Sequence, residues 1–290
     1  MSASQPLAYR VVDVFTDRAF SGNPLAVVLD ADDLTTEQMQ AIAREFNLSE
    51  TTFPVAASSP DAAYRLRIFT PSAELPFAGH PSVGSAWVMR SIGRVADGRI
   101  IQECGAGLLP VDIAGDAATL TGGTPTLRDA LDAVDVAAVL AAVGLDGSDL
   151  VGDPVRWAGT GIEFGFVHVR PDAVSRASLD PTLARQIAMS AGISVFSFVD
   201  GVANARVFAP GAGVDEDPAT GSAALGLGVW LAACGRVATE GETSYGIVQG
   251  VDMGRPSRLD CVVRCEGGIA VEGRVTGSVV PIAEGHIRRP

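Results

Sequence analysis

The chain repeats itself weakly but in order, and this internal repeat constrains its fold more than any other feature. The segment Arg67–Pro71 (RIFTP) is matched about 140 residues later by Arg206–Pro210 (RVFAP). Two further matches, one upstream and one downstream, occur in the same order at nearly the same separation. Matches that keep their order and spacing are the signature of a duplicated architecture. We therefore expect two similar halves.

Each half is predicted to contain one helix that is apolar on nearly every side. The first spans 81–92 and stops at Gly93, and the second spans 222–234 and stops at Gly235. A helix of this kind must be buried. Short strands with frequent Gly and Pro turns surround both helices. The sequence thus predicts an α+β fold of two pseudo-symmetric lobes, each an antiparallel barrel-like sheet wrapped around a central helix.

The two lobes are predicted to meet near residues 121–127, a stretch rich in Gly, Thr and Pro that is typical of a linker. The N-terminal lobe then comprises residues 1–120, completed by a C-terminal strand over 276–290. The C-terminal lobe comprises residues 121–275.

Each lobe is also expected to carry a helix ahead of two β-rich segments. In the first lobe it covers 32–46, where Thr35 and Gln38 fit a capping box. Its counterpart is predicted over 181–191. The second lobe has an additional helical segment at 127–143.

Composition excludes several kinds of chemistry. All 21 basic residues are arginine, so a pyridoxal-phosphate Schiff base, a Walker-type phosphate loop and a lysine general base are excluded. The net charge of −13 disfavours nucleic acid and anionic lipid as partners. The four cysteines lack metal-ligand spacing, so we expect reduced thiols and no metal. No segment reads as a signal peptide or a membrane span, which favours a cytoplasmic protein.

The two halves differ at the junction where the first helix meets a strand. Glu50 in the first half corresponds to Val195 in the second. A valine suggests an apolar neighbourhood, and there the pKa of a glutamate is raised, as a general acid–base near neutral pH requires. An exposed glutamate at a strand edge explains Glu50 equally well at this level.

Both buried helices are preceded by a glycine, Gly79 in the first half and Gly221 in the second. The first amides of a helix have no intrahelical partner, and together with the helix dipole they favour a carboxylate or phosphate. His80 and Asp217 lie beside these helix starts. His80 could instead be a helix cap or a core histidine, and Asp217 an N-terminal cap. Gly221 and Ser222 could serve only tight packing and capping.

Taken together, the motifs resemble the PhzF-like isomerase family of phenazine biosynthesis, which is related in fold to diaminopimelate epimerase and proline racemase. The matching segments run through nearly the whole chain and are 13–16 with 22–24, 47–51, 74–81, 217–223, and 249–250 with 253–257.

This resemblance implies a homodimer that needs no cofactor. It implies that Glu50 shuttles a proton, while His80 and Asp217 position the substrate and assist the transfer. It also implies a substrate-binding set made of Ser49, Gly79, Gly221 and Ser222. The related racemases carry one cysteine before each central helix, but Ala78 and Pro218 stand at those positions here. A two-thiol racemase mechanism is therefore excluded.

We expect a cofactor-independent isomerase that moves a proton between carbons of a small carboxylate-bearing, amino-substituted substrate. Two alternatives stay open: an epimerase or dehydratase that abstracts a proton next to a carboxylate, and a non-catalytic small-ligand binder on the same scaffold. A structural or interaction protein ranks last, because the chain has no coiled coil, charged tail or low-complexity segment. The sequence does not single out the substrate.

Overall fold

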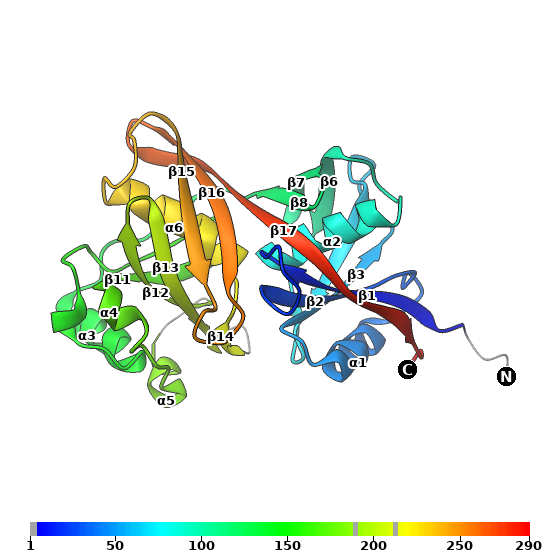
Figure 1. The fold of residues 1–290 in the computed structure, drawn as a ribbon, viewed down its shortest axis with the longest axis horizontal. Coiled ribbons are helices and arrows are strands. Elements are labelled where there is room, and N and C mark those ends of the chain that lie inside the picture. The colour runs from blue at the N-terminus through cyan, green and yellow to red at the C-terminus, as the bar shows by residue number, and fades with distance from the viewer. Residues whose placement is uncertain (1–4, 188–190, 211–213) are drawn as a thin grey trace. The chain divides into compact units, whose positions relative to one another are not determined.

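The structure, a computed structural model, describes residues 5–187, 191–210 and 214–290. It divides into two compact units, drawn in Figure 1. Unit 1 is Met1–Thr121 with Thr276–Pro290, and unit 2 is Gly122–Val275. For the domains themselves, 1–120 with 276–290 and 121–275 remain our proposal.

Unit 1 is built around a closed sheet. Its elements are β1 (Leu7–Val14), β2 (Asn23–Val28), α1 (Thr36–Phe46), β3 (Glu50–Val55), β4 (Tyr64–Phe69), β5 (Glu74–Leu75), α2 (Gly79–Ser91), β6 (Gly98–Cys104), β7 (Gly107–Ala114), β8 (Ala117–Thr121) and the C-terminal part of β17 (Ile269–Ile287). The pairings run β1–β2–β3–β4–β6–β7–β8–β17 and return from β17 to β1, which closes the barrel.

Unit 2 repeats this arrangement with additional helices. Its elements are β9 (Thr126–Leu127), α3 (Ala133–Ala142), a 3-10 turn (Gly147–Asp149), β10 (Arg156–Gly159), β11 (Glu163–His168), α4 (Pro171–Val174), α5 (Pro181–Ala184), β12 (Gly192–Val199), β13 (Val202–Ala209), β14 (Val214–Asp217), α6 (Gly221–Ala233), β15 (Gly241–Gln249), β16 (Ser257–Glu266) and the first part of β17. The pairings run β9–β10–β11–β12–β13–β15–β16.

Most strand pairings are antiparallel, as the sequence predicts, but among the described residues each unit also contains two parallel ones. They are β2–β3 and β4–β6 in unit 1, and β11–β12 and β13–β15 in unit 2. Parallel neighbours need a long crossover connection, usually a helix. The helices supply it: α1 lies between β2 and β3, α2 between β4 and β6, and α6 between β13 and β15.

The two predicted central helices are confirmed. All residues of α2 from Gly79 to Met89 are buried, and the helix packs against β1, β2, β3, β4, β7 and β8. All residues of α6 from Gly221 to Leu231 are buried, and it packs against β9, β10, β11 and β16. The fold is thus α+β, with a strand-wrapped helix in each of two similar lobes (Figure 1).

The internal repeat is also visible in side-chain contacts. Arg67 on β4 forms a two-pronged ion pair with Glu74 on β5, with a closest distance of 2.7 Å. Arg206 on β13 pairs in the same way with Glu216 on β14, also at 2.7 Å. Each guanidinium lies over the phenylalanine two residues further along its strand, 5.2 and 5.1 Å from the ring centre. Equivalent strands therefore carry equivalent contacts.

The other predicted helices are confirmed in part. The capping box of Thr35 and Gln38 is present and α1 begins at Thr36. The helix predicted over 127–143 is shorter, because Leu127 belongs to β9 and α3 begins only after its cap, Asp132. The helix predicted over 181–191 is limited to α5, and residues 188–190 lie outside the described part of the chain.

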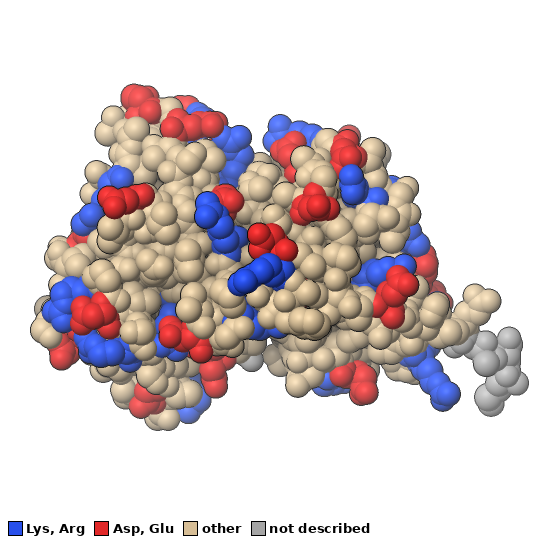
Figure 2. All heavy atoms as spheres, viewed as in Figure 1, with Lys and Arg blue, Asp and Glu red and all other residues tan. Residues whose placement is uncertain are grey.

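Figure 2 shows acidic and basic side chains interleaved on the face in view, with no extended patch of one sign. Within the described residues, no helix has both the length and the apolar character that a membrane crossing requires.

Candidate active site

Glu50 is the first residue of β3, and Ser49 directly precedes it. The Glu50 side chain is only 12% exposed, so it is not a glutamate at a solvated strand edge. The strand is fixed against the central helix two residues further on. There, Thr52 donates a hydrogen bond to the carbonyl of Ala26 on β2 and accepts one from Ser85 on α2, at 3.3 and 2.9 Å. These contacts hold the start of β3 next to α2.

His80 is the second residue of α2, and its side chain is 4% exposed. Its Nε2 atom lies 3.3 Å from Oε2 of Glu50. Burial lowers the pKa of His80 to about 3, because the low-dielectric surroundings disfavour the imidazolium. The imidazole is therefore neutral near pH 7. The structure thus places a neutral imidazole against a nearly buried carboxyl side chain.

The start of α2 has no side-chain cap. Ala78 occupies the N-cap position, and the first turn contains no acidic residue, so the amide of Gly79 is not satisfied by a capping side chain. A buried network fixes this turn: Ser82 donates to the carbonyl of Ala78, Gln102 donates to Ser82, and Tyr64 donates to Gln102, at 2.9, 2.9 and 3.0 Å. An uncapped helix start held rigidly in this way favours an anionic group.

Unit 2 repeats the uncapped helix start with different side chains. Thr220 is the N-cap of α6 but makes no capping hydrogen bond, and Gly221 and Ser222 are buried. The Thr220 hydroxyl instead donates to the carboxylate of Asp217 at 2.5 Å. Asp217 is the last residue of β14 and is buried.

Gln249, at the end of β15, ties this turn together. Its amide nitrogen donates to the carbonyl of Asp217 and to the Thr220 hydroxyl, at 2.7 and 3.0 Å. Its amide oxygen accepts the backbone N–H of Thr220 at 3.3 Å. Gly250 follows at a φ of +73°, and a Cβ atom there would lie 2.6 Å from the carbonyl oxygen of Pro218. Only glycine permits this approach without strain.

The structure gathers Ser49, Glu50, Gly79 and His80 in unit 1, and it gathers Asp217, Gly221 and Ser222 in unit 2. The sequence did not single out three further side chains in these groups, namely Asn23, which contacts His80, Thr220 and Gln249. All three lie inside the segments that match the family, which is the one signal that could have marked them.

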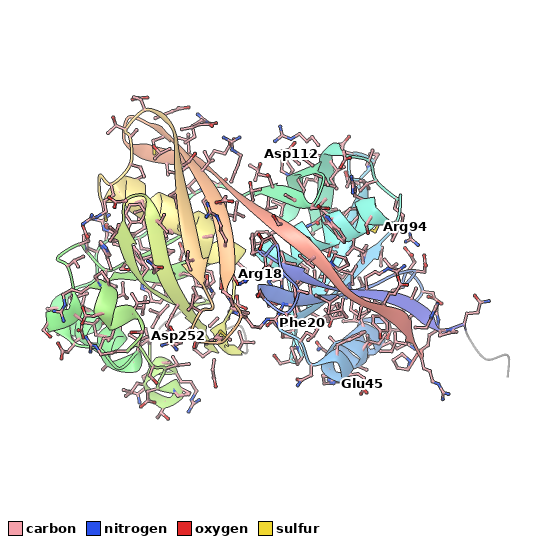
Figure 3. The ribbon with its side chains drawn as sticks, in the orientation of Figure 1. Arg18, Phe20, Glu45, Arg94, Asp112 and Asp252 are labelled. Carbon is pink, nitrogen blue, oxygen red and sulfur yellow. The ribbon has the colours of Figure 1, made fainter. Side chains whose placement is uncertain are left out.

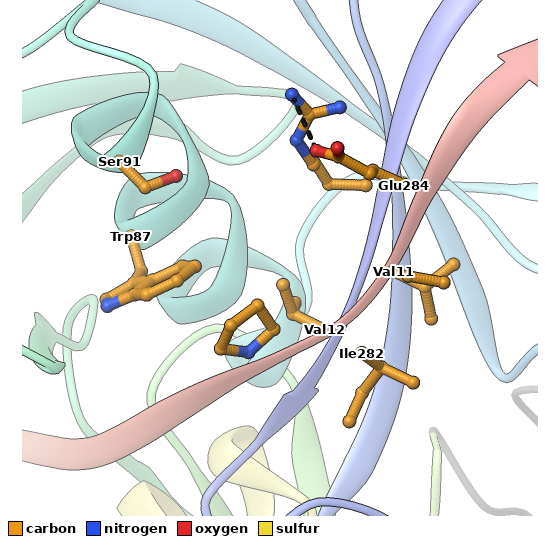
Figure 4. Close-up of a pocket in the computed structure, with 9 residues that line it drawn as sticks. Val11, Val12, Trp87, Ser91, Ile282 and Glu284 are labelled. Atoms are coloured by element: carbon orange, nitrogen blue, oxygen red, sulfur yellow. Dashed lines mark ion pairs between the residues drawn. The ribbon is translucent and has the colours of Figure 1, made fainter.

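Unit 1 also contains a separate cavity of about 420 Å³, shown in Figure 4. It is lined by Arg10, Val11, Val12, Trp87, Ser91, Pro281, Ile282, Ala283 and Glu284. Trp87 and Ser91 belong to the C-terminal half of α2, whereas Gly79 and His80 stand at its beginning. This cavity is therefore distinct from the pair of Glu50 and His80.

None of the four cysteines, Cys104, Cys234, Cys261 and Cys265, stands at the position directly before Gly79 or at Pro218 before α6. Burial raises the pKa of the Cys234 thiol to about 11 and that of the Cys261 thiol further still. A buried thiol of this kind is a poor nucleophile and base, because the thiolate is the reactive form. Cys234 and Cys261 are therefore poor candidates for a catalytic base.

Solved structures share this fold along almost its full length. A PhzF-family phenazine biosynthesis protein from Bacillus anthracis matches with a TM-score of 0.87 at 26% identity, covering 98% of this chain and 99% of that one. A probable proline racemase from Agrobacterium radiobacter matches in fold alone, with a TM-score of 0.68 at 13% identity, covering 97% and 92%. The chain thus has the fold that PhzF-family proteins share with proline racemases.

Sequence comparison identifies the family. The model for phenazine biosynthesis-like proteins, PhzC-PhzF, matches residues 12–285. The trans-2,3-dihydro-3-hydroxyanthranilate isomerase of Pseudomonas aeruginosa is 36% identical to this chain, covering 96% of the chain and 98% of that protein. The chain therefore belongs to the PhzC-PhzF family, and it is an isomerase.

Proposed function

We propose that this isomerase moves a proton between two carbons of a small carboxylate-bearing, amino-substituted substrate, and that it does so without a cofactor. The observation that carries the proposal is the nearly buried carboxyl group of Glu50 beside the neutral imidazole of His80, next to the uncapped start of α2. The substrate class follows that of the related isomerase from Pseudomonas aeruginosa, whose name specifies a dihydro-hydroxyanthranilate.

In this mechanism Glu50 accepts a proton from a substrate carbon, and the electron pair of that C–H bond stays on the substrate. Glu50 then returns the proton to a second carbon, so the product has the mass of the substrate. Positioned acid–base catalysis typically contributes about 10²–10⁴-fold. The amide of Gly79 would stabilise the negative charge that the substrate carries or develops, as backbone donors do in oxyanion holes.

The same proposal gives Asp217 a part in substrate positioning and proton transfer, and it assigns substrate binding to Ser49, Gly221 and Ser222. The buried contacts of Asp217 and the uncapped start of α6 support these assignments. The homodimer, the cytoplasmic location and the absence of nucleic-acid partners are parts of the proposal that rest on the family resemblance and the acidic composition.

The test is hydrogen exchange during turnover. Trans-2,3-dihydro-3-hydroxyanthranilate and related amino acids are incubated in D₂O with wild-type enzyme and with Glu50→Gln, and deuterium incorporation is followed by NMR. We expect the wild type to place deuterium on carbon, and Glu50→Gln to be slower by about 10²-fold or more. The matched control is Glu45→Gln, the same change at an exposed position on α1 labelled in Figure 3, which should leave the rate unchanged.

Wild-type rates in Glu50→Gln would refute the role of Glu50. The remaining outcomes separate the alternative functions. A product with inverted configuration at one carbon indicates epimerisation, and a loss of water in the mass spectrum indicates dehydration. A ligand that binds but never exchanges hydrogen indicates a binding protein.

A further inference from the structure

The loop between β1 and β2 is held in a strained conformation that ends at Asn23. Phe15 and Phe20 both have positive φ angles, 65° and 64°, which side chains of this size rarely adopt. Gly22 follows at +68°, and a Cβ atom there would lie 2.3 Å from the carbonyl oxygen of Val14. Backbone strain of this kind persists only where the surroundings enforce it, and it is concentrated at functional sites.

A buried carboxylate secures the same loop. Asp13, at 2% exposure, accepts the backbone N–H of Phe20 at 2.7 Å. The Phe20 ring itself is exposed on this loop, close to Arg18 in sequence (Figure 3). Phe20 therefore does not hold the loop by packing, whereas Phe15, at the start of the loop, is fully buried. Its fixed backbone delivers Asn23, fully buried, to the first position of β2.

Asn23 contacts the imidazole of His80 on the ring nitrogen that does not face Glu50. The Nδ2 atom of Asn23 lies 3.2 Å from Nδ1 of His80. An amide NH₂ group can only donate, so Nδ1 must offer its lone pair. A neutral imidazole carries one N–H group, which must then be on Nε2. This atom lies 3.3 Å from Oε2 of Glu50, close enough for an electrostatic contact, although the two atoms are not aligned as a hydrogen bond.

We propose that Asn23 is a positioning residue that keeps His80 in the tautomer protonated at Nε2, so that the imidazole faces Glu50 as a donor and Glu50 is the base. This inference rests on the proposed function. An N–H group facing a carboxylate stabilises its ionised form, which is the form that accepts a proton. When the substrate C–H bond breaks, the new O–H bond forms on Glu50. When that O–H bond breaks, the proton passes to the second carbon, and His80 keeps its own N–H throughout.

His168 in unit 2 provides an internal contrast. Its Nε2 accepts the backbone N–H of Phe198 at 3.2 Å, so its proton is on Nδ1, which donates to Asp153 at 2.6 Å. The two buried histidines are thus assigned opposite tautomers by their partners. The chain has only three histidines, and the third, His286, is exposed. The nitrogen signals of all three can therefore be assigned separately.

The test is ¹⁵N NMR of protein labelled at histidine, combined with steady-state kinetics. In the wild type we expect the pattern of an Nε2–H tautomer for His80 and of an Nδ1–H tautomer for His168. Asn23→Asp replaces the donor by a group that only accepts, so the His80 proton should move to Nδ1. We expect kcat to fall at least about tenfold with a smaller change in KM, as when a catalytic histidine is held in the wrong tautomer. Asp17→Asn, at an exposed position of the same loop, is the control and should change neither readout.

An Nδ1–H pattern for His80 in the wild type would overturn the inference, as would an Asn23→Asp variant with an unchanged tautomer or an unchanged kcat. If Asn23→Asp does not fold, Asn23→Ser takes its place. A hydroxyl can donate or accept, so His80 should then populate both tautomers, and a single Nε2–H tautomer would count against the role of Asn23. The spectrum needs no substrate. The tautomer is therefore decided even where Glu50→Gln refutes the proposed function.

Discussion

Phe53 pairs with Arg67 as Val195 pairs with Arg206, so strand register aligns Val195 with Phe53. It aligns Glu50, the first residue of β3, with Gly192, the first residue of β12. The structure thereby corrects the pairing of Glu50 with Val195 that the sequence suggested.

Val195 is fully buried and belongs to an apolar cluster of unit 2 that includes Val167 and Ile193. The position that corresponds to His80 is Ser222, which carries no titratable group at neutral pH. The backbone is therefore repeated in both units, but of the two central helices only α2 begins beside a carboxyl–imidazole pair, that of Glu50 and His80.

Substitutions at Glu50 and Val195 test this asymmetry. We expect Glu50→Val to fold with a free energy of unfolding equal to or above that of the wild type, because it replaces a nearly buried carboxyl group by an apolar side chain, while isomerase activity is lost. Val195→Glu should lower the free energy of unfolding by about 3 kcal/mol or more, since it places a carboxyl group in an apolar cluster. Urea denaturation of both variants measures this, and a Val195→Glu protein as stable as wild type would contradict it.

Gln249 has a structural role, because its side chain stabilises the turn between β14 and α6. Replacing it by leucine removes the partners of two buried groups, the backbone N–H of Thr220 and the carbonyl of Asp217. Each buried polar group left unsatisfied costs about 1–3 kcal/mol, so Gln249→Leu should lower the free energy of unfolding by roughly 2–6 kcal/mol. Gln186→Leu makes the same change at an exposed position and should have little effect. Equal stability of the two variants would argue against this account.

Among the secondary-structure elements, local sequence patterns predicted the helices whose formation depends on contacts between neighbouring residues. The capping box of Thr35 and Gln38 involves neighbours in sequence, and the two central helices are apolar over their entire length. The sequence therefore identified α1, α2 and α6 with ends within a few residues of those observed.

Contacts between distant segments were not predicted, because local sequence patterns carry no information about them. Asn23 and His80 are separated by 57 residues, and Thr220 and Gln249 by 29, so no spacing rule connects them. The parallel pairings within each sheet also escaped, because alternation of apolar residues does not reveal strand direction. The placement of Glu50 beside His80 depends on both kinds of contact, and the sequence indicated the residues but not the geometry.

The central helices allow a prediction about packing. Gly84 in α2 and Gly226 in α6 occupy equivalent positions. A Cβ atom at Gly84 would meet the side-chain ends of Leu25 and Val14 at 2.7 Å, whereas one at Gly226 would meet the backbone oxygen of Ala158 at 2.9 Å. Alanine gains about 1 kcal/mol in helix propensity, but overpacking a core typically costs about 1–3 kcal/mol.

Side-chain ends can shift and the backbone of a paired strand cannot. We therefore expect Gly226→Ala to be clearly destabilising and Gly84→Ala less so. Gly147→Ala, where a Cβ atom would meet nothing within 4 Å, is the control and should be neutral or slightly stabilising. Thermal unfolding monitored by circular dichroism gives the order of stability of the three variants. If Gly84→Ala were less stable than Gly226→Ala, the strand backbone packed against α6 would have to shift more easily than the side chains packed against α2.

For the whole molecule, each unit contains one buried neutral histidine, His80 in unit 1 and His168 in unit 2. Burial lowers the pKa of His80 to about 3, and burial also lowers the pKa of His168 despite its contact with Asp153. In the unfolded chain both imidazoles titrate near their ordinary value of about 6.5. Below that pH the unfolded chain binds more protons than the folded one, so folding stability falls as the pH decreases.

The loss of folding stability on acidification therefore arises in both units, and it should be measurable between pH 7 and pH 5. Between pH 7 and pH 5, His80 alone should reduce the free energy of unfolding by about 2 kcal/mol, with a further loss from His168. Carboxylates with ordinary pKa values contribute little above pH 5, so the window isolates the histidines. Denaturant unfolding at both pH values measures the effect. His80→Gln should remove its share of the difference, while His286→Gln, at an exposed position, should leave the difference intact. A wild type equally stable at pH 7 and pH 5 would mean that both histidines titrate in the folded protein as they do in the unfolded chain.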